Sequence, residues 1–380
     1  MIPRLLTEVL EKTPKSILLI GPRQVGKSTL IEQLAPKLSL NLADEETYLE
    51  FKSNPAALKE LLGSESYRSV FIDEIQRHPP LLNTIQSILD QKKSNPPKFY
   101  ITGSSARKLK RGQANLLPGR VLSFELGGLC SAELGYRLDV RRALSRGTLP
   151  EPYLETNEKL AEKILLSYAG TYLKEEIQAE AATRNLEGFS RFLRYAGESA
   201  GLAQDFSKLA KRAKIERKAC GRFFEILEDT LIASRLESFD ETDADVVKRP
   251  KYYFFDVGVL NGLLGNFTPS LDRSGMLFEH LVVNQILNSS RAHDVLVELS
   301  YFRTRGGYEV DLILKIKRQL FAIEIKHGQV GSSEAKNLLQ FGKFHKKVDG
   351  YFIVVPEGRN RTIEGVRILE LNGFLKEVGL

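Results

Sequence analysis

The chain has 380 residues, of which 42% are hydrophobic and 27% charged, a balance that excludes a disordered or fibrous protein. This length accommodates two or three domains. No apolar run approaches the roughly 18 residues of a membrane-spanning helix. The first residues lack the pattern of a secretory signal, and the two cysteines, Cys130 and Cys220, have no metal-ligand spacing. We therefore expect a cytoplasmic protein that has no membrane segment and no disulfide framework.

Short apolar runs alternate with helical patterns over the first ~125 residues, an order typical of a parallel sheet flanked by helices. The expected buried strands are residues 16–20, 38–42, 69–72, 98–102 and 121–124. The first, third and fourth end directly at polar residues. Because ligands of open α/β sheets bind at the carboxyl ends of strands, we expect the functional site of this part there.

The character of the sequence changes twice further along. Residues 131–248 are rich in Leu, Ala, Glu, Lys and Arg, with helices expected at 157–180, 187–199 and 216–235. From residue 249 an α/β pattern returns, with strands expected at 251–255, 308–316, 320–326 and 350–355 and a helix at about 275–289. We therefore expect three domains, over residues 1–130, 131–248 and 249–380.

The segment after the first expected strand fits the phosphate-binding pattern G-x-x-x-x-G-K-[ST]. Its glycines allow backbone N–H groups to surround phosphate oxygens, and the following helix adds its positive N-terminal end. In this pattern Lys27 reaches the β- and γ-phosphates, and the Ser28 hydroxyl ligates Mg²⁺. The predicted ATP-binding residues are Gly21, Pro22, Arg23, Gln24, Val25, Gly26, Lys27, Ser28 and Thr29.

Two further strand ends supply candidates for hydrolysis. Asp73 and Glu74 follow the run SVFI. Phosphoryl transfer needs a carboxylate near Mg²⁺ and a group that orients water, so we assign Asp73 to the metal and Glu74 to the water. The strand FYIT leads to Ser104. Either Ser104 or Thr102 before it is placed to hydrogen-bond the γ-phosphate or the attacking water. An ordinary polar turn is the alternative.

Arg120 is a candidate for stabilising the charge that develops on the γ-phosphate. It follows a basic segment that contains Arg107, Lys108, Lys110 and Arg111. The sequence leaves open whether Arg120 acts within its own chain, acts from a neighbouring subunit, or forms a structural salt bridge.

The net charge of +7 is concentrated in residues 207–222, where seven basic residues accompany a single acid. The segment is expected to form a helix, a turn and a second helix, and such a unit can place Lys and Arg against nucleic-acid phosphates. A solvated basic face that only joins two domains is the alternative. The candidate contacts are Lys208, Lys211, Arg212, Lys214, Arg217, Lys218 and Arg222.

Two β-type runs flank Lys317 and Arg318. If these two residues form the turn of a hairpin, alternation places Asp311, Glu324 and Lys326 on one face, with Asp311 opposite Glu324. Facing carboxylates repel unless a cation lies between them, which fits a divalent metal with Lys326 beside it, as in metal-dependent nucleases. An exposed Glu-x-Lys ion pair is the alternative, and Lys-Arg is an unusual turn pair.

Ten sequence words occur in order over nearly the whole chain. They are GPRQVGKST (21–29), FIDEIQRHP (71–79), ITGSSARKL (101–109), LPGRV (117–121), RGTLPEPYL (146–154), YLKEEI (172–177), YYFFDVGVLNGLLG (252–265), GMLFEH (275–280), RTRGGYEVDLIL (303–314) and AIEIKHG (322–328). With these words the chain resembles bacterial and archaeal AAA-type ATPases that carry a C-terminal domain of unknown function related to restriction endonucleases.

The resemblance implies an AAA-type ATPase core, a helical middle part with a winged-helix-like segment at about 200–240, and a PD-(D/E)xK nuclease-like α/β end. It points to the same Asp311, Glu324 and Lys326, and it adds Glu279 as an upstream acid that ligates the metal or holds water. Nuclease-like domains also persist as binding modules that do not cleave.

Two functions follow for a chain that uses ATP and Mg²⁺. In the first, ATP hydrolysis drives the basic segment and the C-terminal domain on DNA. In the second, the chain is a signalling or scaffold ATPase that controls a protein partner, and its nuclease-like domain is inactive. Nucleotide-gated assembly of a homo-oligomer is a third and weaker alternative.

Overall fold

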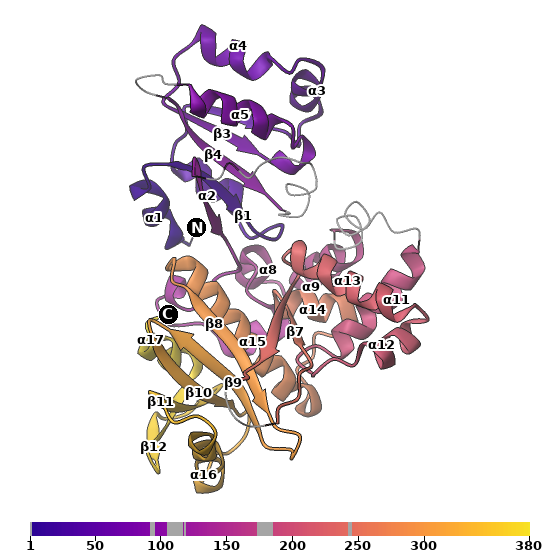
Figure 1. Ribbon diagram of the computed structural model, residues 1–380, viewed down its shortest axis with the longest axis vertical. Helices are drawn as coiled ribbons and strands as arrows, with labels where there is room; N and C mark the ends of the chain where they lie inside the picture. The colour runs from indigo at the N-terminus through magenta and orange to yellow at the C-terminus, as the bar shows by residue number, and fades with distance from the viewer. Residues whose placement is uncertain (1, 92–95, 105–116, 118, 173–184, 242–244) are drawn as a thin grey trace. The chain divides into compact units, whose positions relative to one another are not determined.

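The structure is a computed structural model that describes residues 2–91, 96–104, 117, 119–172, 185–241 and 245–380 (Figure 1). The chain divides into two compact units. The first contains residues 1–127 and 229–231, and the second contains residues 128–228 and 232–380. Most of the helical segment 131–248 and all of segment 249–380 therefore lie in the second unit.

The first unit is built on five parallel strands in the order β2-β3-β4-β1-β5. Their bounds are β1 Ser16–Ile20, β2 Leu38–Asn41, β3 Ser69–Asp73, β4 Lys98–Gly103 and β5 Val121–Glu125. Each lies within one residue of the strand expected from the sequence, which confirms the predicted parallel sheet.

Helices flank this sheet because alternate strand residues are apolar on both faces. Val70 and Ile72 of β3 pack with Ile85 and Ile88 of α5 in one core, and Figure 1 shows α5 beside β3 and β4. Phe71, between them in sequence, is buried as well. The helical elements are α1 Leu6–Lys12, α2 Lys27–Gln33, α3 Glu45–Ser53, α4 Ala57–Ser64, η1 Ile75–Arg77 and α5 Leu81–Asp90.

The second unit contains an eight-stranded mixed sheet in the order β12-β13-β11-β10-β9-β8-β6-β7. Strand β10 pairs antiparallel with β9 and parallel with β11, and β11 pairs parallel with β13. The strands are β6 Ala233–Ser238, β7 Lys251–Phe254, β8 Val297–Arg303, β9 Glu309–Ile316, β10 Gln319–Ile325, β11 Gly350–Val355, β12 Arg361–Ile363 and β13 Val366–Glu370.

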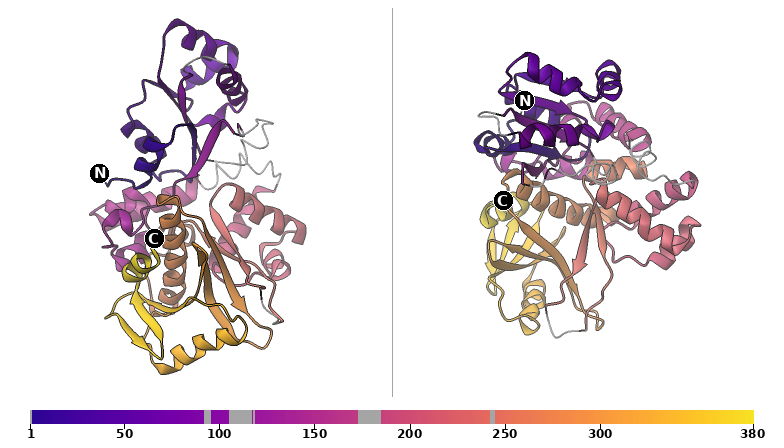
Figure 2. Two further views of the ribbon diagram at one scale, coloured as in Figure 1. Left: turned by 60° about the vertical axis from the view of Figure 1, so that its left-hand side comes forward. Right: turned by 45° about the horizontal axis from the view of Figure 1, so that its top comes forward.

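Helices cover both faces of this second sheet. Ala335 of α16 packs with Ala322 and Ile353 in one core, whereas Phe374 of α17 contacts Phe352, which alternation places on the opposite face. The long helix α15, brown in Figure 2, runs along the sheet and contacts β7 and β10. These helices are α15 Leu271–Ala292, α16 Ser332–Leu339, followed by η4 Gln340–Lys343, and α17 Leu371–Val378.

The remaining helical elements come before β6 in the chain, except α14, which follows β7. They are η2 Ala132–Leu134, α7 Val140–Arg146, α8 Pro150–Leu154, α9 Glu158–Ser167, the π-helical turn η3 Tyr168–Tyr172, α11 Leu186–Glu198, α12 Phe206–Ala213, α13 Arg217–Asp229 and α14 Val257–Leu264. The helix expected at 157–180 ends its α-helical part at Ser167, and residues 173–180 lie outside the described residues.

The helix expected at 216–235 is wrong at its C-terminal end. Helix α13 stops at Asp229, and residues from Ala233 onward form β6. This strand pairs with β7 on one side and with β8 on the other. Pairing on both sides outweighs the helical composition of the segment, because strand preference depends mainly on neighbouring strands and burial.

The β9–β10 hairpin has the register that the sequence predicts. Gln319 pairs with Ile316 and Ile323 pairs with Leu312, so the next pair in this register is Asp311 opposite Glu324. Lys317 and Arg318 both have positive φ, at 49° and 69°, as a two-residue type I′ turn requires. The hairpin thus adopts the short turn despite a residue pair that is unfavourable for it.

Candidate functional site

The predicted phosphate loop joins β1 to α2 at the carboxyl end of β1. Gly26 caps α2 with φ 92° and ψ 27°, a left-handed conformation that glycine adopts without strain. The Lys27 side chain is 5% exposed, and its ammonium donates hydrogen bonds of 2.8 Å to the carbonyls of Gly21 and Pro22. The lysine is therefore held against the loop whose amides would surround a phosphate.

Arg4 braces this loop from outside the motif. Its guanidinium is buried and donates hydrogen bonds to the carbonyl of Val25 at 2.6 Å and to that of Gly127 at 2.9 Å. Sequence reasoning missed Arg4, because an arginine near the start of a chain carries no signal of a tertiary contact. A buried guanidinium with fixed acceptors limits the conformations that the loop can adopt.

Asp73 and Glu74 lie at the carboxyl end of β3, in the same sheet as the loop strand. The Oδ1 atom of Asp73 accepts hydrogen bonds from the backbone N–H of Glu74, at 3.0 Å, and from the Thr102 hydroxyl. Glu74 has φ 57° and ψ 42°, a strained conformation for a residue with a side chain. Such strain is concentrated at functional sites, where the surrounding structure compensates for it.

Gln76 joins the two catalytic candidates Glu74 and Ser104. Its Nε2 donates hydrogen bonds to the Glu74 carboxylate and, at 2.9 Å, to the Ser104 hydroxyl. The Ser104 N–H donates to Gln76 Oε1 at 3.3 Å. Gln76 is buried, and its hydrogen bonds hold the Glu74 and Ser104 side chains close together. Sequence reasoning missed this residue, although it stands only two positions after Glu74.

The residues at this edge fit a nucleotide with a divalent metal. Strands β1, β4 and β3 are neighbours, so the loop, Asp73 and Ser104 all follow carboxyl ends at one edge of the sheet. Ser28 and Asp73 offer a hydroxyl and a carboxylate, the oxygen ligands that Mg²⁺ prefers. The chemistry available here is the binding of a triphosphate with a carboxylate, Glu74, placed to orient water.

Arg120 forms a two-pronged ion pair with Asp90 at the end of α5. Its Nε lies 2.7 Å from Asp90 Oδ1 and its Nη2 lies 3.1 Å from Oδ2. This contact, led by its hydrogen bond, keeps the pKa of Asp90 below its usual value. The structure thus places Arg120 in the salt bridge that the sequence left open. Arg107, Lys108, Lys110 and Arg111 lie outside the described residues.

The three hairpin residues Asp311, Glu324 and Lys326 come together in the second unit. Asp311 Oδ2 accepts a 2.8 Å hydrogen bond from the N–H of Ile325, and Lys326 Nζ lies 2.7 Å from Glu324 Oε1. Burial, with the charges of Glu324 and Glu279, raises the pKa of Asp311 to about 8. Burial also raises the pKa of Glu324. Carboxylates that resist ionisation next to one another form a site that attracts a cation.

A buried lysine that the sequence analysis missed already supplies part of that positive charge. Lys251 is 5% exposed, and its ammonium lies 3.1 Å from Glu309 and 3.6 Å from Glu279. Glu279 also accepts a hydrogen bond from the Tyr253 hydroxyl. Glu279 is thus bound to Lys251 and Tyr253. Within the described ranges, no group of three or more His, Cys, Asp or Glu side chains is arranged to hold a metal ion.

We expect the stability of the metal-free protein to fall between pH 4 and pH 8 because of Asp311. In the unfolded chain this carboxyl ionises near 3.8, whereas in the folded protein its pKa is about 8. The folded state therefore keeps a proton that the unfolded state releases, and the resulting stabilisation is lost as the pH rises through that window. Asp311→Asn should be more stable than the wild type at pH 8 by several kcal/mol and similar to it at pH 4.

Urea unfolding in the presence of a chelator measures this difference. Asp349→Asn is the matched control, because Asp349 is exposed and accepts a similar 2.8 Å bond from the N–H of Leu320 at the other end of β10. The interpretation would be wrong if Asp311→Asn and the wild type lost stability equally between the two pH values.

The seven basic candidates of residues 207–222 are all exposed. They lie on α12, on α13 and in the short turn between these helices, while the apolar residues Leu209, Phe223 and Leu227 are buried. Arg212 also has a local role, because it pairs with Glu198 at 2.7 Å and lies over the ring of Tyr195. The expected helix-turn-helix arrangement therefore forms, with its charges facing solvent.

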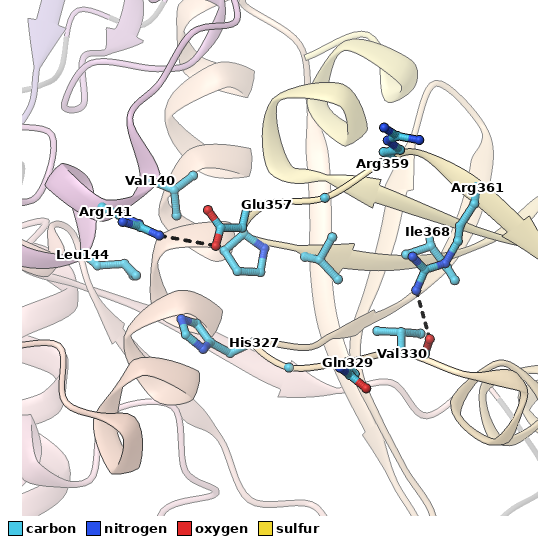
Figure 3. Close-up of a pocket in the computed structure, with 14 residues that line it drawn as sticks. Val140, Arg141, Leu144, His327, Gln329, Val330, Glu357, Arg359, Arg361 and Ile368 are labelled. Carbon is cyan, nitrogen blue, oxygen red and sulfur yellow. Dashed lines mark hydrogen bonds and ion pairs between the residues drawn. The ribbon is translucent and has the colours of Figure 1, made fainter.

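A cavity of about 640 Å³ opens at the carboxyl ends of β10 and β11 (Figure 3). The loop after β10, residues 327–330, forms one side, and residues 355–359 from the end of β11 form another. Arg141 of α7, Arg359 and Arg361 contribute positive charge to its lining. Nothing in the sequence marked this cavity, because its residues come from four separate segments.

Comparisons with known proteins locate one domain of recognised type. Residues 13–135 match the AAA domain family AAA_14. Residues 137–270 match a domain of unknown function, DUF8612, and residues 274–374 match another, DUF4143. No curated protein matches the sequence significantly. In the described part of the chain, no helix has the length and apolar character needed to cross a membrane.

The solved structures similar to this chain include two with low TM-scores. One is the replication initiator DnaA bound to AMPPCP and single-stranded DNA, at 11% identity over 59% of this chain and 85% of that chain, with a TM-score of 0.26. The other is protein VC1899 from Vibrio cholerae, at 13% identity over 96% of both chains, with a TM-score of 0.22. At these TM-scores neither likeness carries an argument. The family matches show an AAA-type ATPase domain over residues 13–135, followed by two domains of unknown function.

Proposed function

We propose that the chain binds and hydrolyses ATP at the carboxyl edge of the first sheet, with Mg²⁺ held by Ser28 and Asp73. The observation that carries the proposal is the hydrogen-bonded set of Glu74, Gln76 and Ser104 next to the metal candidate Asp73. A carboxylate that can orient water, a side chain that fixes its direction and a hydroxyl that can contact phosphate are thereby joined by short contacts at the ends of β3 and β4. The AAA domain match supports nucleotide hydrolysis in general.

Each residue has a distinct task in this proposal. Lys27 exchanges its bonds to the loop carbonyls for bonds to phosphate oxygens, which are stronger acceptors because they are charged. Glu74 orients the attacking water, and Gln76 fixes the direction of the Glu74 carboxylate. Ser104 donates to the γ-phosphate or to that water. Bound Mg²⁺ would neutralise charge on the β- and γ-phosphates.

Glu74→Gln is expected to keep ATP affinity within a few-fold and to lower the turnover number by about 10²–10⁴-fold, because the amide orients water less well and cannot accept its proton. Equilibrium nucleotide binding and phosphate release measure the two quantities separately. Glu46→Gln, an exposed change in the first turn of α3, is the matched control. Unchanged turnover in Glu74→Gln would assign the water to another residue.

We further propose that the second unit binds DNA through the exposed basic side chains of residues 207–222, and that Asp311, Glu324 and Lys326 act on a phosphodiester with a divalent metal. The support is the approach of Asp311 and Glu324 across the β9–β10 hairpin and the contact of Lys326 with Glu324. If a metal binds the Glu324 carboxylate, the Lys326 ammonium loses that partner and is placed to hold a phosphate.

The competing function is a signalling or scaffold ATPase whose C-terminal domain does not cleave. It is favoured by Lys251, whose buried ammonium already neutralises Glu279 and Glu309 without a metal. In that case hydrolysis of ATP controls a protein partner, and DNA neither binds in a salt-dependent manner nor is cut.

Labelled DNA incubated with Mg²⁺ or Mn²⁺, with and without ATP, separates these functions. The first predicts binding whose logarithm falls with log salt at a slope near −5 if about six phosphates are neutralised. It also predicts cleavage that Glu324→Ala removes while DNA binding persists. Cleavage that survives Glu324→Ala would place the nuclease elsewhere, and an absence of both binding and cleavage would support the signalling function.

A further inference from the structure

The cavity of Figure 3 lies where two neighbouring parallel strands, β10 and β11, end. Loops at the carboxyl ends of adjacent parallel strands diverge and leave a crevice, and ligands of α/β sheets bind in such crevices. Helix α7 closes one side through Val140, Arg141 and Leu144. The cavity is therefore formed by the sheet geometry together with a helix from an earlier part of the chain.

Positive charge dominates the lining. Three arginines, Arg141, Arg359 and Arg361, face a single acid, Glu357. Arg361 donates one N–H to the carbonyl of Val330 at 2.9 Å, which leaves further donors of its guanidinium for a ligand. Within the described residues, Arg359 has no hydrogen-bond or ion-pair partner. Arg359 lies on the loop that follows β11, and Arg361 is the first residue of β12 (Figure 3).

The acid opposes this charge only weakly. Arg141 and Glu357 are 3.5 Å apart, and their side chains are 86% and 76% exposed. Exposed pairs of this kind contribute little stability. A ligand with two negative charges could therefore replace Glu357 as the partner of Arg141, and the exposed Glu357 side chain could turn toward solvent.

Besides His327 and Gln329, the other side chains of the lining are apolar. Val140, Leu144, Val330, Val355, Pro356 and Ile368 supply this wall. The cavity volume of about 640 Å³ is in the range of small-molecule sites, which combine an apolar wall with a few placed polar groups. An inorganic anion would leave this wall unused, so the lining favours an anion that carries an apolar or planar body.

We propose that this cavity binds a nucleoside phosphate. Arg359 and Arg361 bind the phosphate, for which planar guanidinium groups are suited, and the base packs on the apolar wall. A free mononucleotide and the 5′-phosphorylated end of an oligonucleotide share this chemistry. The site is separate from the phosphate loop, and the proposal does not depend on ATP hydrolysis there.

Calorimetric titration of the full chain carrying Lys27→Ala, in which the phosphate loop is impaired, tests the site with AMP as the probe. We expect AMP to bind, and adenosine and inorganic phosphate each to bind at least about tenfold more weakly. The double variant Arg359→Gln/Arg361→Gln should weaken AMP binding by at least about tenfold. Glu357→Gln should strengthen it, because the change removes the one opposing charge.

Arg318→Gln is the matched control, since Arg318 lies in the β9–β10 turn, outside this cavity, and should leave AMP binding unchanged. Thermal unfolding checks that each variant is folded. A 5′-phosphorylated dinucleotide that binds more tightly than AMP assigns the source to an oligonucleotide end, and weaker binding assigns it to a free nucleotide. The proposal is overturned if AMP does not bind, if adenosine binds as tightly as AMP, or if the double arginine variant binds AMP like its parent.

Discussion

Replacement of Lys27 by alanine is expected to weaken ATP binding by at least about 100-fold and to reduce turnover to background. The buried ammonium is held only 2.8 Å from the loop carbonyls of Gly21 and Pro22, next to the amides that would surround phosphate. Each charge-assisted hydrogen bond that it makes to a phosphate contributes about 1.5–3 kcal/mol, and about 1.4 kcal/mol corresponds to a tenfold change in affinity. Fluorescent-nucleotide titration and phosphate release measure the two effects.

Lys12→Ala provides the matched control for this experiment. Lys12 also lies in the first unit, but it is exposed on α1 and pairs with Glu8 one turn away. This change should leave binding and turnover unaltered. Because Lys27 is buried, urea unfolding must show that Lys27→Ala is folded. A folded Lys27→Ala protein that binds ATP with wild-type affinity would contradict the assignment of the loop.

The second large effect concerns stability. Gly147→Ala is expected to lower the free energy of unfolding by about 3–5 kcal/mol. Gly147 has φ 68° and ψ −156°, a conformation that is almost confined to glycine. A Cβ atom there would also lie 1.9 Å from Oδ1 of Asp256. That carboxylate is buried and accepts bonds from the N–H groups of Thr148 and Val259, so displacing it breaks both.

Gly135→Ala is the control for positive-φ strain without the steric clash, in an αL conformation that costs alanine less than the conformation of Gly147 does. Gly135 also caps a helical turn with positive φ, 62°, but a Cβ atom there meets nothing within 4 Å. We expect a cost of about 1–2 kcal/mol for that change. Urea unfolding of both variants gives the comparison, and equal losses would show that the Asp256 contact contributes nothing.

The sequence predicted best those features that depend on residues close to one another along the chain. The five strands of the first sheet follow from short apolar runs, and the phosphate loop follows from glycine spacing between a strand and a helix. The β9–β10 register followed from placing Lys317 and Arg318 at the hairpin turn and counting alternate residues from there, and it holds although these two are poor turn residues. Burial of a whole strand face evidently outweighs the cost of an unfavourable turn.

The contacts that depend on distant segments were not predictable from one sequence. Gln76 gains its role only because β3 and β4 are neighbours and bring Ser104 beside it. Lys251 looks like an ordinary charged residue, yet folding buries it between Glu279 and Glu309. The C-terminal end of the helix expected at 216–235 likewise forms strand β6, because its partners β7 and β8 lie further along the chain.

The dependence of ATP hydrolysis on Mg²⁺ in Asp73→Asn tests the central claim most directly. If Asp73 and Ser28 share the metal of the bound nucleotide, the wild type hydrolyses ATP only when Mg²⁺ is present. The variant should then lose most turnover at every Mg²⁺ concentration and still bind ATP in a chelator as tightly as the wild type does. A variant with the turnover and the Mg²⁺ dependence of the wild type would contradict this account.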